Sequence, residues 1–278
     1  QCYVTPNAKG GAFYKDFLVV MLLKIMRQNV IVHYHNKGVA TRQNRCLDNL
    51  LYKMFFKNLK VILLSENLYQ DIKKYVEYKD VYICPNGIPI HENLPTVPQK
   101  EFNILFLSNM MEEKGVWDLL EACTILKKKG KPIKCHFVGK WSDIKEEQFI
   151  DEINKRELTE YVFAHGAKYG NEKDVFLQKT DVFVFPTYYN NECFPLVLLE
   201  AMEQGLPCIS TNEGGIPSII ENEKTGYIIE KHSPQIIAEK IEYLMEHPQQ
   251  CANMGKAGRK KFLNEFTLDK FEARIKNI

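Results

Sequence analysis

The feature that most restricts the fold of this 278-residue sequence is the regular alternation of short apolar segments with helical segments. Strands are predicted at 102–107, 133–138, 162–164, 181–185, 207–210 and, more briefly, 227–229. Helices are predicted near 115–129, 143–156, 171–179, 195–204, 234–246, 249–264 and 268–277. Alternation at this spacing predicts strand–helix–strand units and therefore a parallel sheet. The uninterrupted apolar run 182–185 is typical of a strand buried on both faces.

Residues 1–84 alternate in the same way, as half of a doubly wound domain. Helices are predicted near 14–28, 44–58 and 67–76, and strands at 30–34, 61–64 and 81–84. The sequence starts at Gln1 in what reads as mid-domain sequence, so we expect an upstream piece with the opening strand–helix units to be absent. An inter-domain hinge and linker is predicted from the helix- and strand-breaking residues Pro85, Asn86, Gly87, Pro89, Pro95 and Pro98.

Three parts are expected along the chain. Residues 1–98 are predicted to be a partial N-terminal domain with the hinge, and residues 99–265 a C-terminal domain. Residues 266–278 are predicted to form a helix that crosses back to the first domain. The order of strands and helices alone supports the boundary near 98, because regular structure is interrupted there.

Composition narrows the class of protein. With 45% hydrophobic and 26% charged residues and a net charge of +2, the chain is typical of soluble globular proteins. No apolar run reaches 18 residues, so no membrane-spanning helix is expected. The eight cysteines form no C-x-x-C pair and no zinc spacing, so we expect reduced thiols, no metal site and a cytoplasmic location.

Charge is unevenly distributed along the chain. Residues 1–98 carry 13 Lys and Arg against 7 Asp and Glu, a net charge of +6, and residues 99–278 carry 24 against 28, a net charge of −4. The first part therefore suits an acidic partner or an anionic membrane. Nucleic acid is not an expected partner, because no basic motif is interleaved with stacking aromatic residues.

The strongest motif lies between 188 and 205, where Glu192 and Glu200 stand eight residues apart. Glu192 is in the loop after a predicted buried strand, and Glu200 is in the following helix. That helix starts near 194–196, and its free N–H groups and dipole favour a phosphate there. Carboxylates beside it suit sugar or ribose hydroxyls. The alternative interpretation is that Glu192 is an acidic residue at a helix start and Glu200 a solvated surface residue. The spacing alone does not decide between the two interpretations.

Two further loops have phosphate-binding chemistry. Lys114-Gly115 follows the first strand of the second part, where a lysine can contact a diphosphate, although most such lysines are solvated. Gly214-Gly215 follows the fifth strand, where backbone N–H groups form either an anion nest or a plain tight turn. Neither loop is a P-loop or a G-x-G-x-x-G fingerprint, so NTPase and dinucleotide-binding functions are not indicated.

The first part contains two more candidates. His33 and His35 alternate on one strand and share a face, where substrate contact or polar packing is favoured over a metal because no third ligand has a suitable spacing. Within 44–60, Leu47, Leu50, Leu51, Met54 and Phe55 form a stripe at helical spacing with lysines and an arginine around it. Such a stripe usually faces a core, and the more specific interpretation is peripheral membrane contact.

Together these motifs resemble the retaining glycosyltransferases of family 4, which have the two-domain GT-B fold. The glutamate pair with Phe194-Pro195-Leu196, Glu200-Ala201-Met202 and Gly205-Leu206-Pro207 carries the most specific part of the likeness. Glu213-Gly214-Gly215, Lys114-Gly115 and Pro85-Asn86-Gly87 occur in the order of that family. Gly10-Gly11 and His33-Tyr34-His35 resemble the later half of its N-terminal domain. The resemblance therefore implies two Rossmann-like domains with parallel sheets. Residues 1–98 would be the incomplete, acceptor-binding domain, and residues 99–265 the nucleotide-sugar-binding domain.

The resemblance also implies roles for individual residues. Glu192, Lys114, His33 and His35 would act at the reacting sugar, and Glu200 would bind the ribose hydroxyls. The diphosphate would be held by Lys114 and by the backbone around Cys193, Phe194, Pro195 and Leu196. Gly166 and Lys168 would line the base. Ser108 and Asn109, where many members carry an arginine, would complete the donor site with Gly214 and Gly215. No metal and no cofactor would be needed.

The implied activity is transfer of a sugar from a UDP- or GDP-sugar to a glycan or lipid-linked acceptor in cell-envelope or capsular polysaccharide synthesis. It would take place in the cytoplasm, at the inner face of the membrane if residues 44–60 make contact there. Two alternatives stay open: a non-catalytic nucleotide- or sugar-binding fragment, and a nucleotide-sugar epimerase on the same fold.

Overall fold

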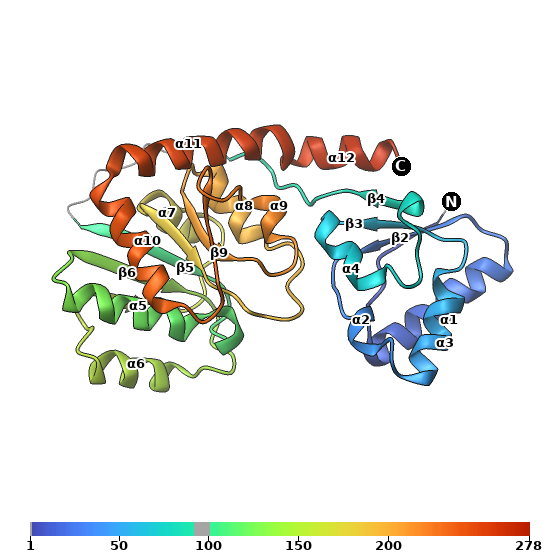
Figure 1. The fold of residues 1–278 in the computed structure, drawn as a ribbon, viewed down its shortest axis with the longest axis horizontal. Helices are drawn as coiled ribbons and strands as arrows, with labels where there is room; N and C mark the ends of the chain where they lie inside the picture. The colour runs from blue at the N-terminus through green and yellow to red at the C-terminus, as the bar shows by residue number, and fades with distance from the viewer. Residues whose placement is uncertain (1, 92–100) are drawn as a thin grey trace.

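The computed structural model describes residues 2–91 and 101–278, and its strands form two parallel sheets (Figure 1). The first sheet has the order β1-β2-β3-β4, with β1 (Cys2–Val4), β2 (Val30–Tyr34), β3 (Lys60–Leu63) and β4 (Val81–Ile83). The second has the order β10-β9-β8-β5-β6-β7. Its strands are β5 (Phe102–Leu107), β6 (Ile133–Val138), β7 (Val162–Ala164), β8 (Val182–Phe185), β9 (Cys208–Thr211) and β10 (Gly226–Ile229). The predicted α/β class with two parallel sheets is confirmed.

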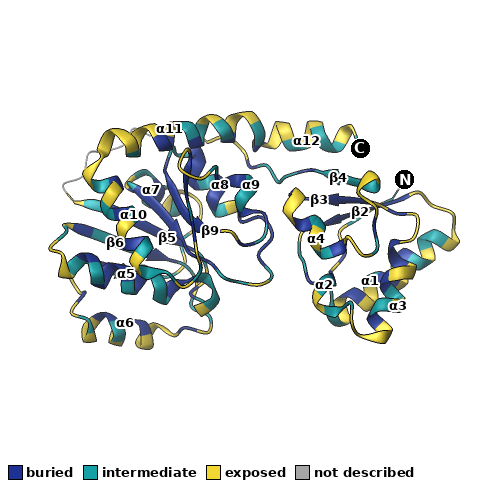
Figure 2. Cartoon of the chain, viewed as in Figure 1, coloured by how far each residue is buried: buried dark blue, intermediate teal, exposed yellow. Residues whose placement is uncertain are grey.

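The second sheet is covered by helices on both faces (Figure 1). These helices are α5 (Val116–Lys128), α6 (Glu146–Lys155), α7 (Asn171–Gln178), α8 (Leu196–Glu203), α9 (Ile216–Ile219), α10 (Pro234–Glu246) and α11 (Pro248–Glu265). Every residue of β8 and β9 is buried, as Figure 2 shows for the centre of this sheet. Burial on both faces explains why these strands are runs of apolar residues instead of an alternating pattern.

Helices α1 (Gly10–Ile25), α2 (Val39–Arg42), α3 (Cys46–Phe56) and α4 (Tyr69–Ile72) accompany the first sheet. Three predictions need correction here. Strand β1 was not expected, α2 was not expected, and the helix predicted at 67–76 is a 3₁₀ turn (Glu66–Leu68) followed by the short α4. β1 pairs with β2 in parallel, from Cys2 opposite Val30 to Val4 opposite Val32.

The apolar stripe predicted at 44–60 is divided between core and surface. Phe55 is buried against Phe13 of α1, with ring centroids 5.5 Å apart, whereas Leu47, Leu50 and Met54 are exposed. Exposed apolar side chains continue on the neighbouring helix. The α1–α3 apolar face is therefore defined as Leu18, Val19, Leu22, Ile25, Met26, Leu47, Leu50 and Met54. Among the described residues, no helix combines the length and the apolar character needed to span a membrane.

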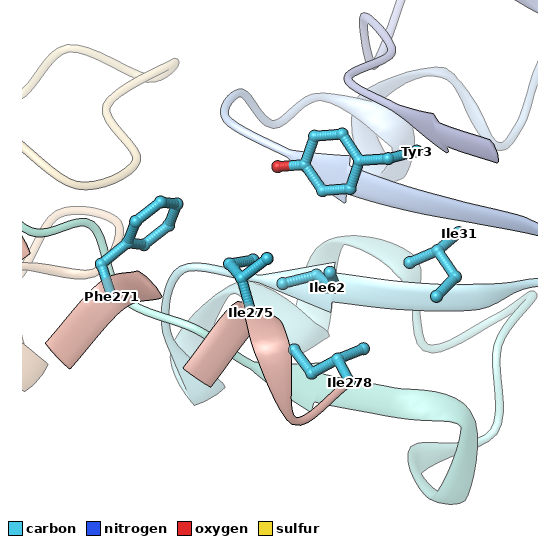
Figure 3. A pocket seen from close by; sticks show the side chains of 6 residues that line it. All are labelled: Tyr3, Ile31, Ile62, Phe271, Ile275 and Ile278. Atoms are coloured by element: carbon cyan, nitrogen blue, oxygen red, sulfur yellow. The ribbon is translucent and has the colours of Figure 1, made fainter. Parts of the chain in front are cut away.

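The last helix, α12 (Leu268–Lys276), lies beside the first sheet although it follows the helices of the second (Figure 1). Its apolar residues pack with Ile31, Ile62 and Tyr82 of the first sheet. An open, largely apolar cavity of about 490 Å³ lies at this contact, and Figure 3 shows the side chains that line it. It is lined by Tyr3, Ile31, Ile62, Phe271, Ile275 and Ile278.

The segment after β4 meets the start of α12 in a short main-chain ladder. The Ile88 N–H donates to the Phe266 carbonyl at 3.0 Å, and the Leu268 N–H donates to the Ile88 carbonyl at 2.9 Å. This contact includes the predicted hinge residue Gly87, whereas Pro95 and Pro98 lie outside the described residues. The three domain ranges 1–98, 99–265 and 266–278 stay predictions.

We expect Gly87→Ala to destabilise the protein, because a β-carbon at this position would lie 2.3 Å from the Thr267 carbonyl oxygen. Relieving that overlap requires a main-chain shift, which costs about 1–3 kcal/mol. Thermal unfolding measures the loss. Gly11→Ala is the matched control, because a β-carbon there meets no atom within 4 Å and alanine suits a helix. Equal melting temperatures for Gly87→Ala and the wild type would contradict the prediction.

Candidate functional site

The loops that follow β5, β8 and β9 meet at the carboxyl edge of the second sheet, which is where parallel α/β sheets bind ligands. Lys114 and Glu192 come together there, with the Lys114 Nζ 2.6 Å from Glu192 Oε2. Their side chains are 13% and 11% exposed, so the pair is largely shielded from water. The Lys114 Nζ also lies 4.4 Å from the centre of the Tyr189 ring. Two residues predicted to act at the same site, 78 positions apart in sequence, are thus in direct contact.

Glu200 lies on α8, facing a second, smaller cavity of about 200 Å³. One of its carboxylate oxygens, Oε1, accepts a hydrogen bond from the Lys173 Nζ at 2.8 Å. The other, Oε2, is buried and has no hydrogen-bond partner among the described residues. A buried carboxylate oxygen without a donor is costly unless a ligand supplies one. Glu200 Oε2 is therefore free to accept a hydrogen bond from a ligand. With a side chain that is 20% exposed and paired with Lys173, Glu200 is not a fully solvated surface residue.

Several predicted donor-site residues surround the same cavity. Ser108, Asn109 and Lys168 line it with Glu200. Gly166 lies next to it, where its carbonyl accepts a hydrogen bond from the Gly139 N–H at 2.9 Å. Lys173 also lines the cavity, and sequence reasoning missed it. No local signal could have found Lys173, because its partner Glu200 lies 27 positions later on a different helix.

The segment Cys193-Phe194-Pro195 leads into α8, which begins at Leu196. No side chain caps this helix end, so its first N–H groups have no side-chain capping partner. Cys193 and Phe194 are buried. Burial raises the pKa of the Cys193 thiol to about 12, so the group is a neutral thiol at pH 7. Cys193 therefore contributes its backbone and its packing, not a thiolate.

The glycine pair packs against this segment. Gly214 has a φ of +55°, and a β-carbon on it would lie 2.2 Å from the Glu192 carbonyl oxygen. The Gly215 N–H donates to the Cys193 carbonyl at 2.6 Å. That N–H is thus already bonded in this structure and is not part of an open anion nest. What the pair visibly does is to let two site loops touch through their main chains.

His33 and His35 do not contact Lys114 or Glu192 within the described residues. His33 is fully buried, its Nδ1 lies 2.6 Å from the Tyr3 hydroxyl, and its ring centre is 4.2 Å from that of His35. Burial and the neighbouring His35 lower the pKa of His33 to about 3, so the ring is neutral at pH 7. Its Nε2 has no hydrogen-bond partner in the described part of the chain.

Other residues of the first sheet's loops, which sequence reasoning missed, reach the site instead. The Lys9 Nζ donates to Asn191 Oδ1 at 2.7 Å, and the hydroxyl oxygens of Ser65 and Ser218 lie 2.7 Å apart. Lys37 forms an ion pair with Glu213, which also pairs with Lys231. These contacts join the loops of the two sheets, and no sequence spacing indicates them because each spans more than 150 residues.

Glu213 lies between these two cations. Burial raises the pKa of its carboxyl, but the hydrogen bonds from Lys231 and Lys37 outweigh that effect, so the pKa lies below its ordinary value of 4.5. The charged form is therefore favoured by folding. Within the described residues, no cluster of three or more metal-ligating side chains is present.

Comparison with known proteins gives a consistent likeness. Residues 92–261 match the model of a family described as glycosyl transferases group 1. The capsular polysaccharide biosynthesis glycosyltransferase CapM of Staphylococcus aureus is 32% identical over 166 residues, 60% of this chain and 42% of that protein. The putative colanic acid biosynthesis glycosyltransferase WcaL of Escherichia coli (strain K12) is 27% identical over 256 residues, 88% of this chain and 62% of that protein. The chain thus spans about half the length of these relatives.

Among solved structures, Anabaena Alr3699/HepE in complex with UDP superposes with a TM-score of 0.82 and 17% identity. The match covers 94% of this chain and 74% of that one. At this identity the likeness concerns the fold, and it confirms the predicted GT-B arrangement of two parallel-sheet, Rossmann-like units.

We expect Glu213→Gln to reduce stability at neutral pH and to have little effect in acid. The folded carboxyl has a lowered pKa, so its stabilisation is present above pH 4.5 and is lost as the pH falls through the folded pKa. Losing two charge-assisted hydrogen bonds costs about 2 kcal/mol at pH 7.

Melting temperatures at pH 7 and pH 3.5 measure this effect, with the exposed Glu239→Gln as the control. A destabilisation by Glu213→Gln that is the same at both pH values would contradict the assignment.

Proposed function

Because this chain belongs to the glycosyl transferases group 1 family, we propose that it transfers a sugar from a nucleotide-sugar to a glycan or lipid-linked acceptor in cell-envelope or capsular polysaccharide synthesis. The observation that carries this proposal is the arrangement at the edge of the second sheet. Glu200, with its free carboxylate oxygen, and Val197 in the first turn of the uncapped helix α8 line one small cavity. The Lys114–Glu192 pair lies on the neighbouring loops of the same sheet edge. The names of the relatives CapM and WcaL support the polysaccharide context.

In the proposed reaction, the nucleoside diphosphate leaves with its electron pair while the sugar develops positive charge. Lys114 and the N–H groups at the start of α8 stabilise the growing negative charge on the diphosphate, which is electrostatic catalysis. Since these groups carry the charge, we propose a reaction that needs no metal and no cofactor. Chelation with EDTA is then expected to leave the rate unchanged.

Glu192 and Glu200 have different proposed tasks. Glu200 Oε2 accepts a hydrogen bond from a ribose hydroxyl, which supplies the hydrogen-bond donor that this buried oxygen lacks. Glu192 holds a hydroxyl of the donor sugar. We propose the retaining, hexosyl-transferring chemistry of family 4, in which the acceptor attacks on the face that the leaving group departs from. The two carboxylates are not an acid–base pair of the kind that hydrolases use, and no nucleophile is assigned to the enzyme.

UDP is the nucleotide that we favour for the donor, and GDP is the alternative. The solved HepE structure, which has the same fold, contains UDP. The roles proposed for Ser108, Asn109, Gly166 and Lys168 follow from their position around the cavity that Glu200 faces. His33 and His35 stay proposed contacts of the reacting sugar. In this structure His33 is buried, so such a contact requires a rearrangement of the residues around it.

We expect UDP to bind, and Lys114→Ala and Glu200→Gln each to weaken binding at least tenfold, because each removes a charge-assisted hydrogen bond to the nucleotide. Calorimetric titration with UDP, GDP and ADP measures this, and exposed Lys128→Ala is the matched control. Lys114→Ala strands the Glu192 carboxylate in a largely buried place, so Lys114→Met/Glu192→Gln tests the same loss without an unpaired charge.

A folded protein that binds none of the three nucleotides would contradict the donor-site proposal. Nucleotide binding without transfer to any glycan would favour the binding-fragment alternative. Release of free nucleotide with an altered sugar and no acceptor product would favour the epimerase.

Peripheral membrane contact is the proposed role of the α1–α3 apolar face. Eight large apolar side chains are exposed there, on two helices that pack together. The surrounding sequence is strongly basic: residues 9–60 contain ten Lys and Arg and only two acidic residues, Asp16 and Asp48. An apolar face within such a segment suits an anionic bilayer surface. We therefore propose a cytoplasmic enzyme at the inner face of the membrane.

We expect Leu22→Glu/Leu50→Glu to abolish binding to phosphatidylglycerol vesicles, because each leucine contributes about 1.5–3 kcal/mol when it leaves water. Vesicle flotation measures the bound fraction. Ile150→Glu on α6, whose isoleucine is also exposed, is the control and should bind like the wild type. Equal flotation of all three proteins, or none by the wild type, would refute the proposed contact.

A further inference from the structure

A cavity of about 580 Å³ lies where loops of the two sheets meet, separate from the smaller cavity beside Glu200. Lys9, Lys37 and Asn67 line it from the first sheet's side, and Asn190 and Asn212 line it from the second. Its volume is in the range of sites that enclose small molecules, about 300–1,000 Å³.

This cavity adjoins the proposed reaction site. The Lys9 Nζ is bonded to Asn191, the residue that precedes Glu192. Gly214 lines the cavity and packs against the Glu192 main chain. A molecule in the cavity therefore lies against the loop that carries the proposed donor-sugar carboxylate, on the side of the first sheet.

The charges in the cavity leave one cation available. Lys37 is paired with Glu213. The Asp71 carboxylate accepts hydrogen bonds from the N–H groups of Gly38, Val39 and Ala40 at 2.8, 3.0 and 2.9 Å, and so it holds the loop before α2. Lys9, in contrast, has no carboxylate partner within residues 2–91 and 101–278, and its hydrogen bond goes to a neutral amide. An ammonium group in this state can take up an anion without breaking an ion pair.

The remaining polar lining suits a sugar. The side-chain amides of Asn67, Asn190 and Asn212 make no hydrogen bond to any described residue, yet they line the cavity from both sides. An amide both donates and accepts, which matches a hydroxyl group. We propose that this cavity is the acceptor subsite, and that it takes a sugar carrying a carboxylate or phosphate, with Lys9 binding the anion. The inference rests on the transfer reaction proposed above and names the class of its acceptor.

The test compares probes that differ in charge, on the full chain with UDP present at saturation. Because bound UDP occupies the diphosphate site, an anionic probe cannot bind at that site and be mistaken for a ligand of the cavity. The probes are methyl glucuronide for a carboxylate, glucose 6-phosphate for a phosphate, and methyl glucoside as the neutral sugar. Dissociation constants are measured by ligand-observed NMR. Lys9→Gln removes the cation, Lys9→Arg keeps it, and Lys15→Gln on the exposed side of α1 is the matched control.

We expect at least one anionic probe to bind about tenfold more tightly than methyl glucoside. Whether methyl glucuronide or glucose 6-phosphate binds more tightly then shows whether the acceptor carries a carboxylate or a phosphate. Lys9→Gln should remove this preference and leave methyl glucoside binding unchanged, whereas Lys9→Arg and Lys15→Gln should retain it. Equal binding of charged and neutral probes, or an equal loss in Lys15→Gln, would overturn the proposal. A chain that fails to bind UDP in its own titration refutes the donor site instead, and the probes are then compared without UDP.

Discussion

The contact between Lys114 and Glu192 is the interaction on which the rest of the site depends. Two opposite charges on different loops, each nearly nine-tenths shielded, neutralise one another and hold the ends of β5 and β8 together. Removing water from such a pair costs free energy, so stability alone does not explain why two charged side chains are buried here. In the proposed reaction the ion pair is a resting arrangement. A diphosphate offers Lys114 a stronger partner, and Glu192 is then released to a sugar hydroxyl.

The contacts between the two sheets are of two physical kinds. On the site side they are polar and few: Lys9 with Asn191, Lys37 with Glu213, and Ser65 with Ser218. On the opposite side α12 brings an apolar surface to Ile31 and Ile62. Polar pairs near water exchange readily with solvent, whereas apolar burial does not. In the proposed reaction, the side that would admit the nucleotide-sugar and the acceptor is thus the side with the weaker contacts.

Local sequence patterns determine the long buried strands, whereas contacts between elements far apart in the chain leave no such pattern. Strands such as 102–107 and 133–138 were predicted with their observed bounds, because a buried parallel strand is an apolar run between breaking residues. β1 was missed because Cys2–Val4 is too short to show a pattern, and α2 because four residues do not complete two turns. Lys114 and Glu192 were found because parallel strands end at one edge. Lys173, Lys9 and Lys37 were not, because their partners depend on packing between elements far apart in sequence.

The ladder at Ile88 has a mechanical consequence. The chain leaves the first sheet through Gly87 and Ile88 and returns to it through Thr267 and Leu268, and these two passages are hydrogen-bonded to each other. Two covalent connections crossing at one place act as a pivot: they resist sliding and separation of the units while leaving rotation about the crossing as the soft motion. Opening of the site would then be a rotation of one unit relative to the other about this crossing. Such a rotation would change the separation between the loops that carry Lys9 and Lys37 and their partners Asn191 and Glu213.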